Sequence, residues 1–316
     1  MMNAPEQFSF QRYLAAKKTI DDRSLNAGVW QALIKHWPRS RKEGAPRVLE
    51  AGMGIGTMLQ RLLERGVLTQ GAYLGIDLEQ ANIQQAREWL TAWAEPHAYR
   101  LEQAQGGIAL HKAARRVETR FRQGDILQYA QQPEAQRTWE VLIAHALLDL
   151  LPVPEAVPAL LGLLRPGGLF YFTCNFDGET IFEPALDPEF DRLVVERYHL
   201  SMDQRQVNGR LSGDSQTGRH LFTALEQAGG RILEAGASDW VVYPRQGLYQ
   251  ADEAYFLYHI LYFFESTLAG QFGEQEPRFR DWLAQRRLQV RGGELVYIAH
   301  QLDFLGRVGE YGGYPD

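Results

Sequence analysis

Residues 47–66 read RVLEAGMGIGTMLQRLLERG, and this one stretch contains the signals of a strand, a turn and a helix. The apolar pair at 48–49 predicts a buried strand, and a helical pattern of apolar and polar residues follows the turn. Between them lie Gly52, Gly54 and Gly56. Because glycine has no Cβ, the backbone can turn tightly there and a ligand can approach it. Strand, glycine turn and helix form the first unit of a nucleotide-binding α/β domain.

The spacing of the acid and the glycines narrows the class of ligand. Glu50 ends the strand, and Thr57 stands where a dinucleotide fingerprint has its third glycine, so the pattern is E-x-G-x-G-x-G. A carboxylate at this place would repel a pyrophosphate but suits a ligand with an ammonium group and no phosphate. The pattern resembles the first motif of the class I S-adenosylmethionine (SAM) dependent methyltransferases. The alternative is an unrelated strand–helix turn, and the later motifs weigh against it.

Composition excludes several other classes of protein. The chain has 316 residues, a net charge of -6 and one cysteine, Cys174. The acidic balance argues against a nucleic-acid binder with a broad basic surface, and one cysteine permits neither an intramolecular disulfide nor a cysteine-built metal site. The N-terminus lacks the apolar core of a signal peptide, and no apolar run is long enough for a membrane span. We therefore expect a cytoplasmic protein without nucleic-acid or membrane partners.

Two further motifs fit a nucleoside site. A strand near 73–76 ends in Asp77, where a nucleotide fold places the carboxylate that accepts hydrogen bonds from the ribose hydroxyls. A strand near 117–121 is followed by Gly124 and Asp125. In the family that the chain resembles, such a Gly-Asp pair contacts the adenine. The resemblance therefore implies a cofactor set that also includes Leu78 and Ile126.

A buried strand at 141–144 carries the next candidate residues at its carboxyl end. Ala144 and His145 lie where ligands bind in open α/β sheets. His145 is predicted to contact the methionine part of SAM or to act as a base, and the alternative is a histidine with a purely structural role. The motif NPPY, which the nucleic-acid amine methyltransferases of this family use, is absent.

The stretch LLRPGGLFYFTC, at 163–174, is typical of the fifth strand of class I methyltransferases. Cys174 lies in this strand and is expected to be a small core residue. The resemblance implies a Rossmann-like, mostly parallel seven-stranded sheet, in which the last strand runs antiparallel between the fifth and sixth. Helical insertions would form a cap over it.

The domain prediction is an N-terminal helical extension or lid at 1–45 and a SAM-binding domain at 46–316. Two helices are expected in the extension, the second beginning near Asp21 and Asp22. By resemblance Tyr13, Arg23 and Asn26 are candidate lid residues, and helix packing is the alternative. Between the second and third strands, the basic cluster Lys112, Arg115 and Arg116 is expected on a solvated helix face.

Insertions are predicted at about 176–217 and 248–292. The first leaves the carboxyl end of a strand and is rich in polar groups, so a lid or substrate wall is expected, with Asn175, Asp177 and the later Trp240 as candidates. The segment at 254–264 is apolar almost all round, which predicts a buried helix, a homodimer interface or a substrate wall.

The resemblance implies a methyltransferase that uses SAM, releases S-adenosyl-L-homocysteine (SAH) and methylates a small molecule. His145 and His220 are the candidate bases, and no metal is indicated because no close ligand set stands out. The alternatives are a protein methyltransferase and a SAM- or SAH-binding module without turnover. Glu50 and Thr57 count against an oxidoreductase that uses NAD, and no paired-aspartate site supports aminopropyl transfer.

Overall fold

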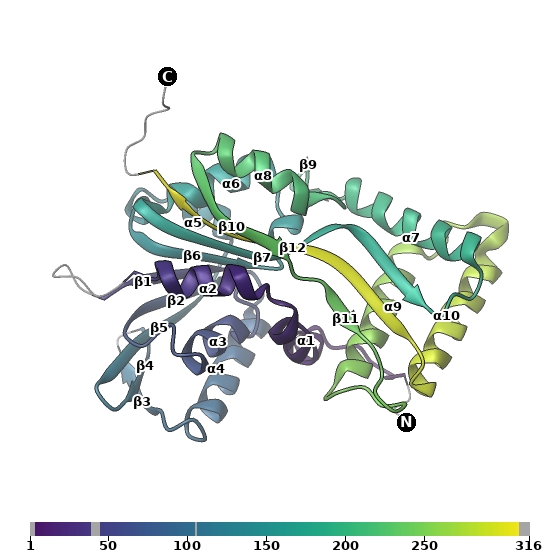
Figure 1. Ribbon diagram of the computed structural model, residues 1–316, viewed down its shortest axis with the longest axis horizontal. Coiled ribbons are helices and arrows are strands. Elements are labelled where there is room, and N and C mark those ends of the chain that lie inside the picture. Colours follow the sequence, from purple (N-terminus) through teal and green to yellow (C-terminus); the bar gives the residue numbers. More distant parts are fainter. Residues whose placement is uncertain (1–3, 39–44, 105, 310–316) are drawn as a thin grey trace.

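One large mixed sheet organises the chain (Figure 1). The computed structural model describes residues 4–38, 45–104 and 106–309. In the sheet, the order of strands is β10-β12-β7-β6-β1-β2-β5-β4-β3, with β11 paired to β12. Their bounds are β1 Arg47–Ala51, β2 Gly71–Asp77, β3 Arg100–Ala104, β4 Gly107–Lys112, β5 Arg115–Gln123, β6 Trp139–His145, β7 Leu164–Glu183, β10 Gly230–Ala237, β11 Trp240–Val242 and β12 Val296–Val308.

The seven predicted strands are confirmed as the core of this larger, ten-stranded sheet. Strands β5, β2, β1, β6 and β7 run parallel to one another. The last strand, β12, is antiparallel to both of its neighbours, β7 and β10. The long helical segment between β11 and β12 therefore interrupts the hairpin without changing the position of the last strand.

Helices cover both faces of this sheet. On one face, α2 (Ala27–His36), α3 (Thr57–Glu64) and α4 (Gln80–Ala94) pack on the strands. On the other, α5 (Ile126–Ala130), α6 (Val153–Gly162) and α8 (Thr217–Gln227) do so. Neighbouring residues of a strand face opposite layers, as Val48 and Leu49 do in β1. Two 3-10 turns, η1 (Pro133–Ala135) and η2 (Leu148–Leu150), flank β6.

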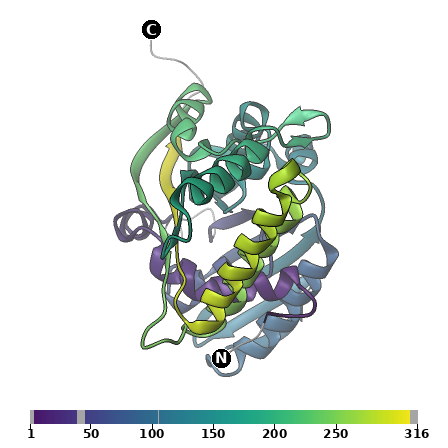
Figure 2. The same ribbon diagram turned by 90° about the vertical axis from the view of Figure 1, so that its right-hand side faces the viewer.

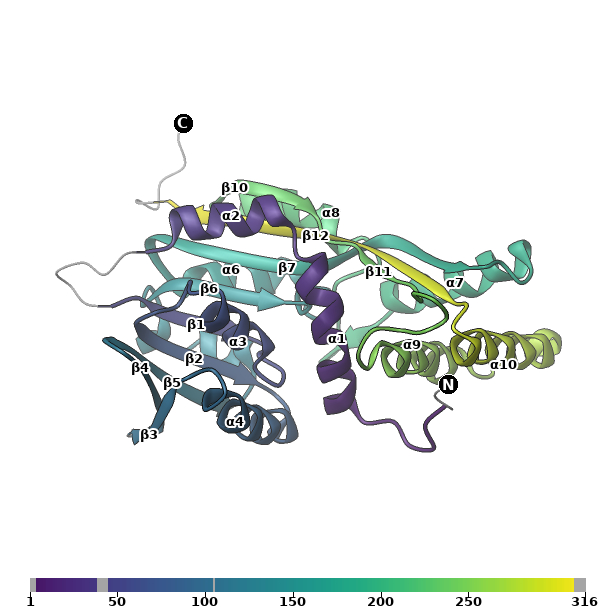
Figure 3. The ribbon, with the colours of Figure 1, turned by 60° about the horizontal axis from the view of Figure 1, so that its bottom comes forward.

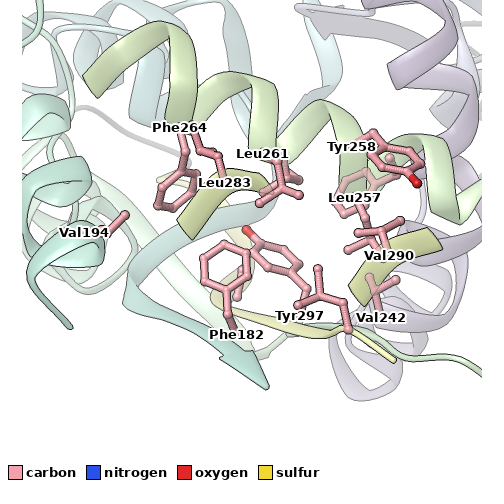
Figure 4. Packing of buried hydrophobic residues seen from close by; sticks show 14 of the residues in the cluster. Phe182, Val194, Val242, Leu257, Tyr258, Leu261, Phe264, Leu283, Val290 and Tyr297 are labelled. Carbon is pink, nitrogen blue, oxygen red and sulfur yellow. The ribbon is translucent and has the colours of Figure 1, made fainter. Parts of the chain in front are cut away.

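A second core lies beyond the carboxyl edge of the parallel strands. The long strands β7 and β12 continue past this edge and, with β11, carry α7 (Pro188–Asp203), α9 (Glu253–Leu268) and α10 (Glu276–Gly292) (Figures 1 and 3). Phe182 of β7 and Tyr297 of β12 lie below α9 residues such as Leu261 and Phe264 (Figure 4). Figure 2 looks onto this second lobe. The lobe also holds η3 (Gly273–Gln275) and the short strands β8 (Gln206–Val207) and β9 (Arg210–Leu211).

The structure corrects the nature of the first insertion. The strand does not end near Cys174 but continues, paired with β12, to Glu183, so the insertion begins as sheet. Cys174 is buried, as expected for a core residue. The helix predicted at 254–264 is α9, and its burial is confirmed, because its side chains pack within the same chain. A homodimer through this helix stays a prediction.

Two expectations about helices were wrong. Asp21 and Asp22 lie near the end of α1 (Phe10–Ser24), and α2 begins instead after Asn26, whose side chain accepts a hydrogen bond from the Val29 amide. The basic cluster lies on the β4–β5 hairpin, because burial around Val117 alternates as in a strand. The linker before β1 lies mostly outside the described residues. Within the described ranges, no helix is long and apolar enough to cross a membrane.

Candidate functional site

The glycine turn after β1 has the tight, left-handed backbone that its glycines allow. Gly52, Gly54 and Gly56 have φ angles of +65°, +53° and +82°, a region that other residues rarely adopt. Side chains from two other segments lie close to the backbone of this turn. A Cβ on Gly52 would lie 2.7 Å from Leu147 Cδ1, and a Cβ on Gly54 would lie 3.3 Å from Leu14 Cδ1 of α1. The segment after β6 and the N-terminal helix α1 therefore both pack closely against the turn.

Asp77 ties the glycine turn to the end of β2. Its carboxylate accepts hydrogen bonds from the amides of Gly54 (2.8 Å) and Glu79 (2.9 Å) and from Nδ2 of Asn82 (3.0 Å). Burial raises the pKa of Asp77, although these three donors oppose the shift. The next residue, Leu78, is 63% exposed, which is high for a large apolar side chain at a sheet edge.

The Gly-Asp pair after β5 lies beside Asp77. The Gly124 amide donates to the Asp77 carbonyl oxygen at 2.9 Å. No heavy atom lies within 4 Å of where a Cβ of Gly124 would stand, so the backbone here borders open space. Asp125 caps α5 by accepting from the Leu127 amide at 2.7 Å, and Ile126 is buried. Asp77, Leu78, Gly124 and Asp125 are thus brought together at one edge.

Glu50 lies in β1 and is buried, with 2% of the residue exposed. The Tyr73 hydroxyl donates to its carboxylate. Burial raises the pKa of Glu50 to about 8, and the Tyr73 hydrogen bond opposes this only in part. At neutral pH Glu50 is therefore mostly protonated until a cation approaches it.

His145 is brought to the expected strand end, but both of its nitrogens are engaged. Nδ1 lies 2.8 Å from the Thr173 hydroxyl, and Nε2 lies 2.9 Å from Oδ2 of Asp21 in α1. Burial lowers the pKa of His145 to about 4, and the nearby charge of Lys17 adds to this. The partners fit a neutral ring that donates from Nε2 to Asp21 and accepts from Thr173. Neither nitrogen is free to take a substrate proton in this arrangement. Its neighbour Ala144 is fully buried.

Asp21 is the centre of a buried polar cluster that sequence reasoning missed. Besides His145, it meets Lys17 at 3.1 Å, Arg61 at 3.3 Å and the Trp240 indole nitrogen at 2.9 Å. We call these five residues the Asp21 cluster. Burial alone would raise the pKa of Asp21, but Lys17, His145 and Arg61 together hold it well below its usual range. Because the five residues come from α1, α3, β6 and β11, the cluster joins the N-terminal helix to both lobes.

The same cluster offers one arrangement of metal-ligand type. Asp21, His145 and Cys174 place one ligand atom each within 4.8 Å of one another. However, the Lys17 and Arg61 cations already lie against Asp21. Because these two side chains supply the compensating positive charge, the electrostatics disfavour an additional metal ion at this place.

Two of the three predicted lid residues, Tyr13 and Arg23, join α1 to the second lobe. The Tyr13 ring stacks on His259 of α9, with 4.6 Å between ring centroids. Arg23 pairs with Glu253 at 2.5 Å and also donates to a carbonyl of β11. Asn26 caps α2 and donates through Nδ2 to the Ala237 carbonyl oxygen, so its amide serves packing. The N-terminal helix thus lies between the two lobes, over the glycine turn (Figure 3).

The remaining candidates lie elsewhere. Asn175 is buried, and its Nδ2 donates to the Leu302 carbonyl oxygen. Asp177 accepts from the Arg219 amide and Nε, both at 2.8 Å, which fixes the start of α8. His220 lies on the exposed side of α8, 3.0 Å from Asp214. Since α8 covers the sheet face opposite to that of His145, the structure does not bring the two candidate bases together.

A hollow of about 330 Å³ lies between α1 and α4, next to the glycine turn. At its edge Gln11 donates to Asn82, which in turn donates to Asp77. The hollow is lined by Ser9, Gln11, Arg12, Ala15, Ile55, Gln85 and Trp89.

No family model matches the sequence, and no curated protein matches it. Several solved structures have a similar backbone fold. A "putative methyltransferase" from Bacillus halodurans C-125 is 12% identical, with 88% of this chain and 98% of that chain covered and a TM-score of 0.49. The YcgJ protein from Bacillus subtilis is 11% identical, with 91% and 100% covered and a TM-score of 0.48. A phosphoethanolamine N-methyltransferase from Haemonchus contortus, in complex with SAH, is 13% identical, with 97% and 61% covered and a TM-score of 0.45.

Because these likenesses are distant, the assignment of the fold rests on the strand order. Strands β1, β2, β5, β6, β7, β10 and β12 take the places of the first to the seventh strand, and the seventh runs antiparallel between the fifth and sixth. The glycine turn follows the first of these strands. The chain has the class I methyltransferase fold. Relative to this fold, the β3–β4 hairpin and the α7–α9–α10 lobe are additions at opposite ends of the sheet.

Proposed function

We propose that the protein is a SAM-dependent methyltransferase that acts on a small molecule. The observation that carries the proposal is the edge formed by Asp77, Leu78 and Gly124 beside the glycine turn. It offers a carboxylate for ribose hydroxyls, an exposed apolar side chain for an adenine face and open backbone between them. Glu50 at the end of β1 can give up its proton and pair with an ammonium group, which suits the methionine part of SAM.

The described residues fit SAM in distinct roles. Asp77 would hold the ribose, and Leu78, Gly124, Asp125 and Ile126 would surround the adenine. Asp77 now accepts three hydrogen bonds, and a carboxylate has room for about four, so a ribose donor can be added. The methionine part would lie along the glycine turn, with Glu50 beneath it and Ala144 and His145 at its far end.

Bound SAM supplies a sulfonium methyl group that needs no further activation. The protein's task is then to position the acceptor and to exclude water. Leu14 and Leu147 now lie against the glycines, so binding requires α1 and the segment after β6 to move outward. The Asp21 cluster holds α1 in the closed position, which makes the N-terminal helix a lid that returns over the bound cofactor.

A second candidate is a SAM- or SAH-binding module without turnover. It is favoured by one observation, that both nitrogens of His145 are bonded within the chain. The exposed His220 is also distant from the sheet face of the glycine turn. A methyl transfer to an already nucleophilic acceptor needs no base, which is why we place catalysis first.

The test is transfer of an isotopically labelled methyl group from SAM to an extract of the source cells. We expect label in the small-molecule fraction with the wild-type protein and much less label with Asp77→Asn. Label in the protein fraction alone would replace the small-molecule substrate with a protein. Label in neither fraction, with SAH still bound, would favour the binding module. A cytoplasmic location and the absence of nucleic-acid and membrane partners stay predictions from the sequence.

A further inference from the structure

Gln11 of α1 is linked to the Asp77 carboxylate by two successive hydrogen bonds. Its Nε2 donates to Oδ1 of Asn82 at 3.0 Å, and Nδ2 of Asn82 donates to Oδ1 of Asp77, also at 3.0 Å. Asn82 lies in the first turn of α4 and is only 3% exposed. Because the Asp77 carboxylate only accepts, the Asn82 amide turns its nitrogen toward Asp77 and its oxygen toward α1. A buried oxygen in this orientation needs a donor, and Gln11 supplies it.

The two oxygens of Asp77 have different partners. Oδ1 accepts from the Glu79 amide at 2.9 Å and from Asn82, whereas Oδ2 accepts from the Gly54 amide at 2.8 Å. A carboxylate oxygen has room for about two donors, so Oδ2 is the oxygen that remains for a ribose hydroxyl. Asn82 therefore helps to fix which oxygen of Asp77 a ribose meets.

One face of α1 covers both supports of this carboxylate. Gln11 and Leu14 are three residues apart, which places them side by side on the helix surface. Leu14 lies against Gly54, the donor to Oδ2, just as Gln11 bonds Asn82, the donor to Oδ1. The Gln11–Asn82 contact is the one hydrogen bond between α1 and α4, both of which the structure describes in full. An outward movement of α1 from the glycine turn would break it.

We propose that Gln11 is a positioning residue that holds α1 closed over the cofactor site through its hydrogen bond to Asn82. The proposal rests on the proposed methyl transfer, since the site that α1 covers is that of SAM. Opening of α1 leaves the buried Asn82 oxygen without its donor, and closing restores the donor. The hydrogen bond therefore controls how fast the cofactor enters and leaves, and it couples the position of α1 to the residue that orients Asp77.

Gln11→Glu disrupts this contact whichever way the Asn82 amide turns. A carboxylate at position 11 only accepts, as Asp77 does, and the Asn82 nitrogen cannot face both of them. One of the two carboxylates then meets the Asn82 oxygen. The change does not weaken the helix itself, because Gln11 is the second residue of α1 and an acid in the first turn interacts favourably with the helix dipole. Loosening of α1 in this variant thus reports the contact with Asn82.

The experiment measures the binding kinetics of SAH to the full chain by stopped-flow tryptophan fluorescence. We expect Gln11→Glu to speed both association and dissociation about three- to tenfold, as the loss of one hydrogen bond predicts for a site that must open in both directions. The matched control is Gln85→Glu, which adds the same charge on the α4 side of the same hollow and should leave both rates unchanged. A residue that only supports the fold would speed dissociation without speeding association.

Hydrogen exchange of the α1 amides provides a second measurement that needs no ligand. In the free protein, exchange should be about three- to tenfold faster in Gln11→Glu than in Gln85→Glu. In an Asn82→Ala background, adding Gln11→Glu should have no further effect, because the two residues act through one contact. Gln11→Ala removes only the donor and lets water reach the Asn82 oxygen, so it should speed both SAH rates about twofold and replaces Gln11→Glu if that variant does not fold.

Two results would overturn the proposal. One is equal α1 exchange in Gln11→Glu and Gln85→Glu, and the other is faster dissociation of SAH without faster association. If SAH does not bind to the wild type but the exchange rates differ as expected, the methyltransferase proposal falls and the contact that holds α1 closed stands.

Discussion

Removing the Asp21 carboxylate should destabilise the protein severely. The side chain is 1% exposed, and its partners Lys17 and Arg61 are 6% and 0% exposed. Asp21→Ala leaves Lys17 buried without its anion, leaves Arg61 with Asp22 as its remaining anion, and takes an acceptor from His145 and Trp240. The substitution therefore breaks the contacts that join α1 to both lobes.

The magnitude follows from the burial of the partners. Removing one member of a buried ion pair costs about 3–5 kcal/mol, because the remaining charge stays uncompensated. The lost hydrogen bonds would add to this, but relaxation and water entry offset part of the sum, since such terms are not additive. We expect a loss of about 4 kcal/mol, which is a large fraction of the roughly 5–15 kcal/mol of a typical folded protein.

The assay is urea-induced unfolding of matched variants. Asp22→Ala is the control, because Asp22 also pairs with Arg61 but its side chain is 29% exposed. Solvent screening at this position should limit the cost to about 1 kcal/mol. If Asp21→Ala lowers the free energy of unfolding no more than Asp22→Ala does, the Asp21 cluster does not hold α1 in place.

Three further outcomes are expected. The folded pKa of His145 is about 4, below its unfolded value of 6.5, so its contribution to stability is present above pH 6.5 and declines as the pH falls toward 4. His145→Gln should therefore reduce the loss of unfolding free energy between pH 7 and pH 5 by about 2 kcal/mol, and an unchanged loss would contradict this. The pKa of Glu50 is raised to about 8, so binding of SAH, which brings an ammonium group, should release a proton near pH 7. The calorimetric enthalpy should then differ between phosphate and Tris buffers for the wild type but not for Glu50→Gln, and equal enthalpies in the wild type would refute the role of Glu50. Asp77→Asn should weaken SAH binding about 10- to 100-fold with unchanged circular dichroism, since a hydrogen bond to a charged group contributes about 1.5–3 kcal/mol. Unaltered affinity would take Asp77 out of the ribose site.

The cofactor half of the molecule could be predicted because its signals are local. The turn through Gly52, Gly54 and Gly56 requires positive φ angles, and only glycine adopts them readily. Asp77 and Gly124 follow short apolar strands, and parallel neighbours bring their ends to the same edge. The strand ends could therefore be predicted without any long-range contact, whereas the strand order was implied by the resemblance to the class I methyltransferases.

The rest depends on contacts between distant segments. Lys17 and Asp21 are four residues apart, like an ordinary ion pair on a helix surface. Only their burial against Arg61, which is distant in the sequence, makes them part of a buried cluster that joins several elements. No local pattern showed that β7 would run on to Glu183, since its continuation is stabilised by pairing with β12.

The most direct measurement is calorimetric titration of the purified protein with SAH, with NAD as the control. We predict micromolar binding of SAH and no binding of NAD, because the Asp77 edge suits an adenosine and Glu50 can pair with the ammonium group of SAH, which NAD lacks. Binding of NAD alone, or of neither ligand, would contradict the proposed function.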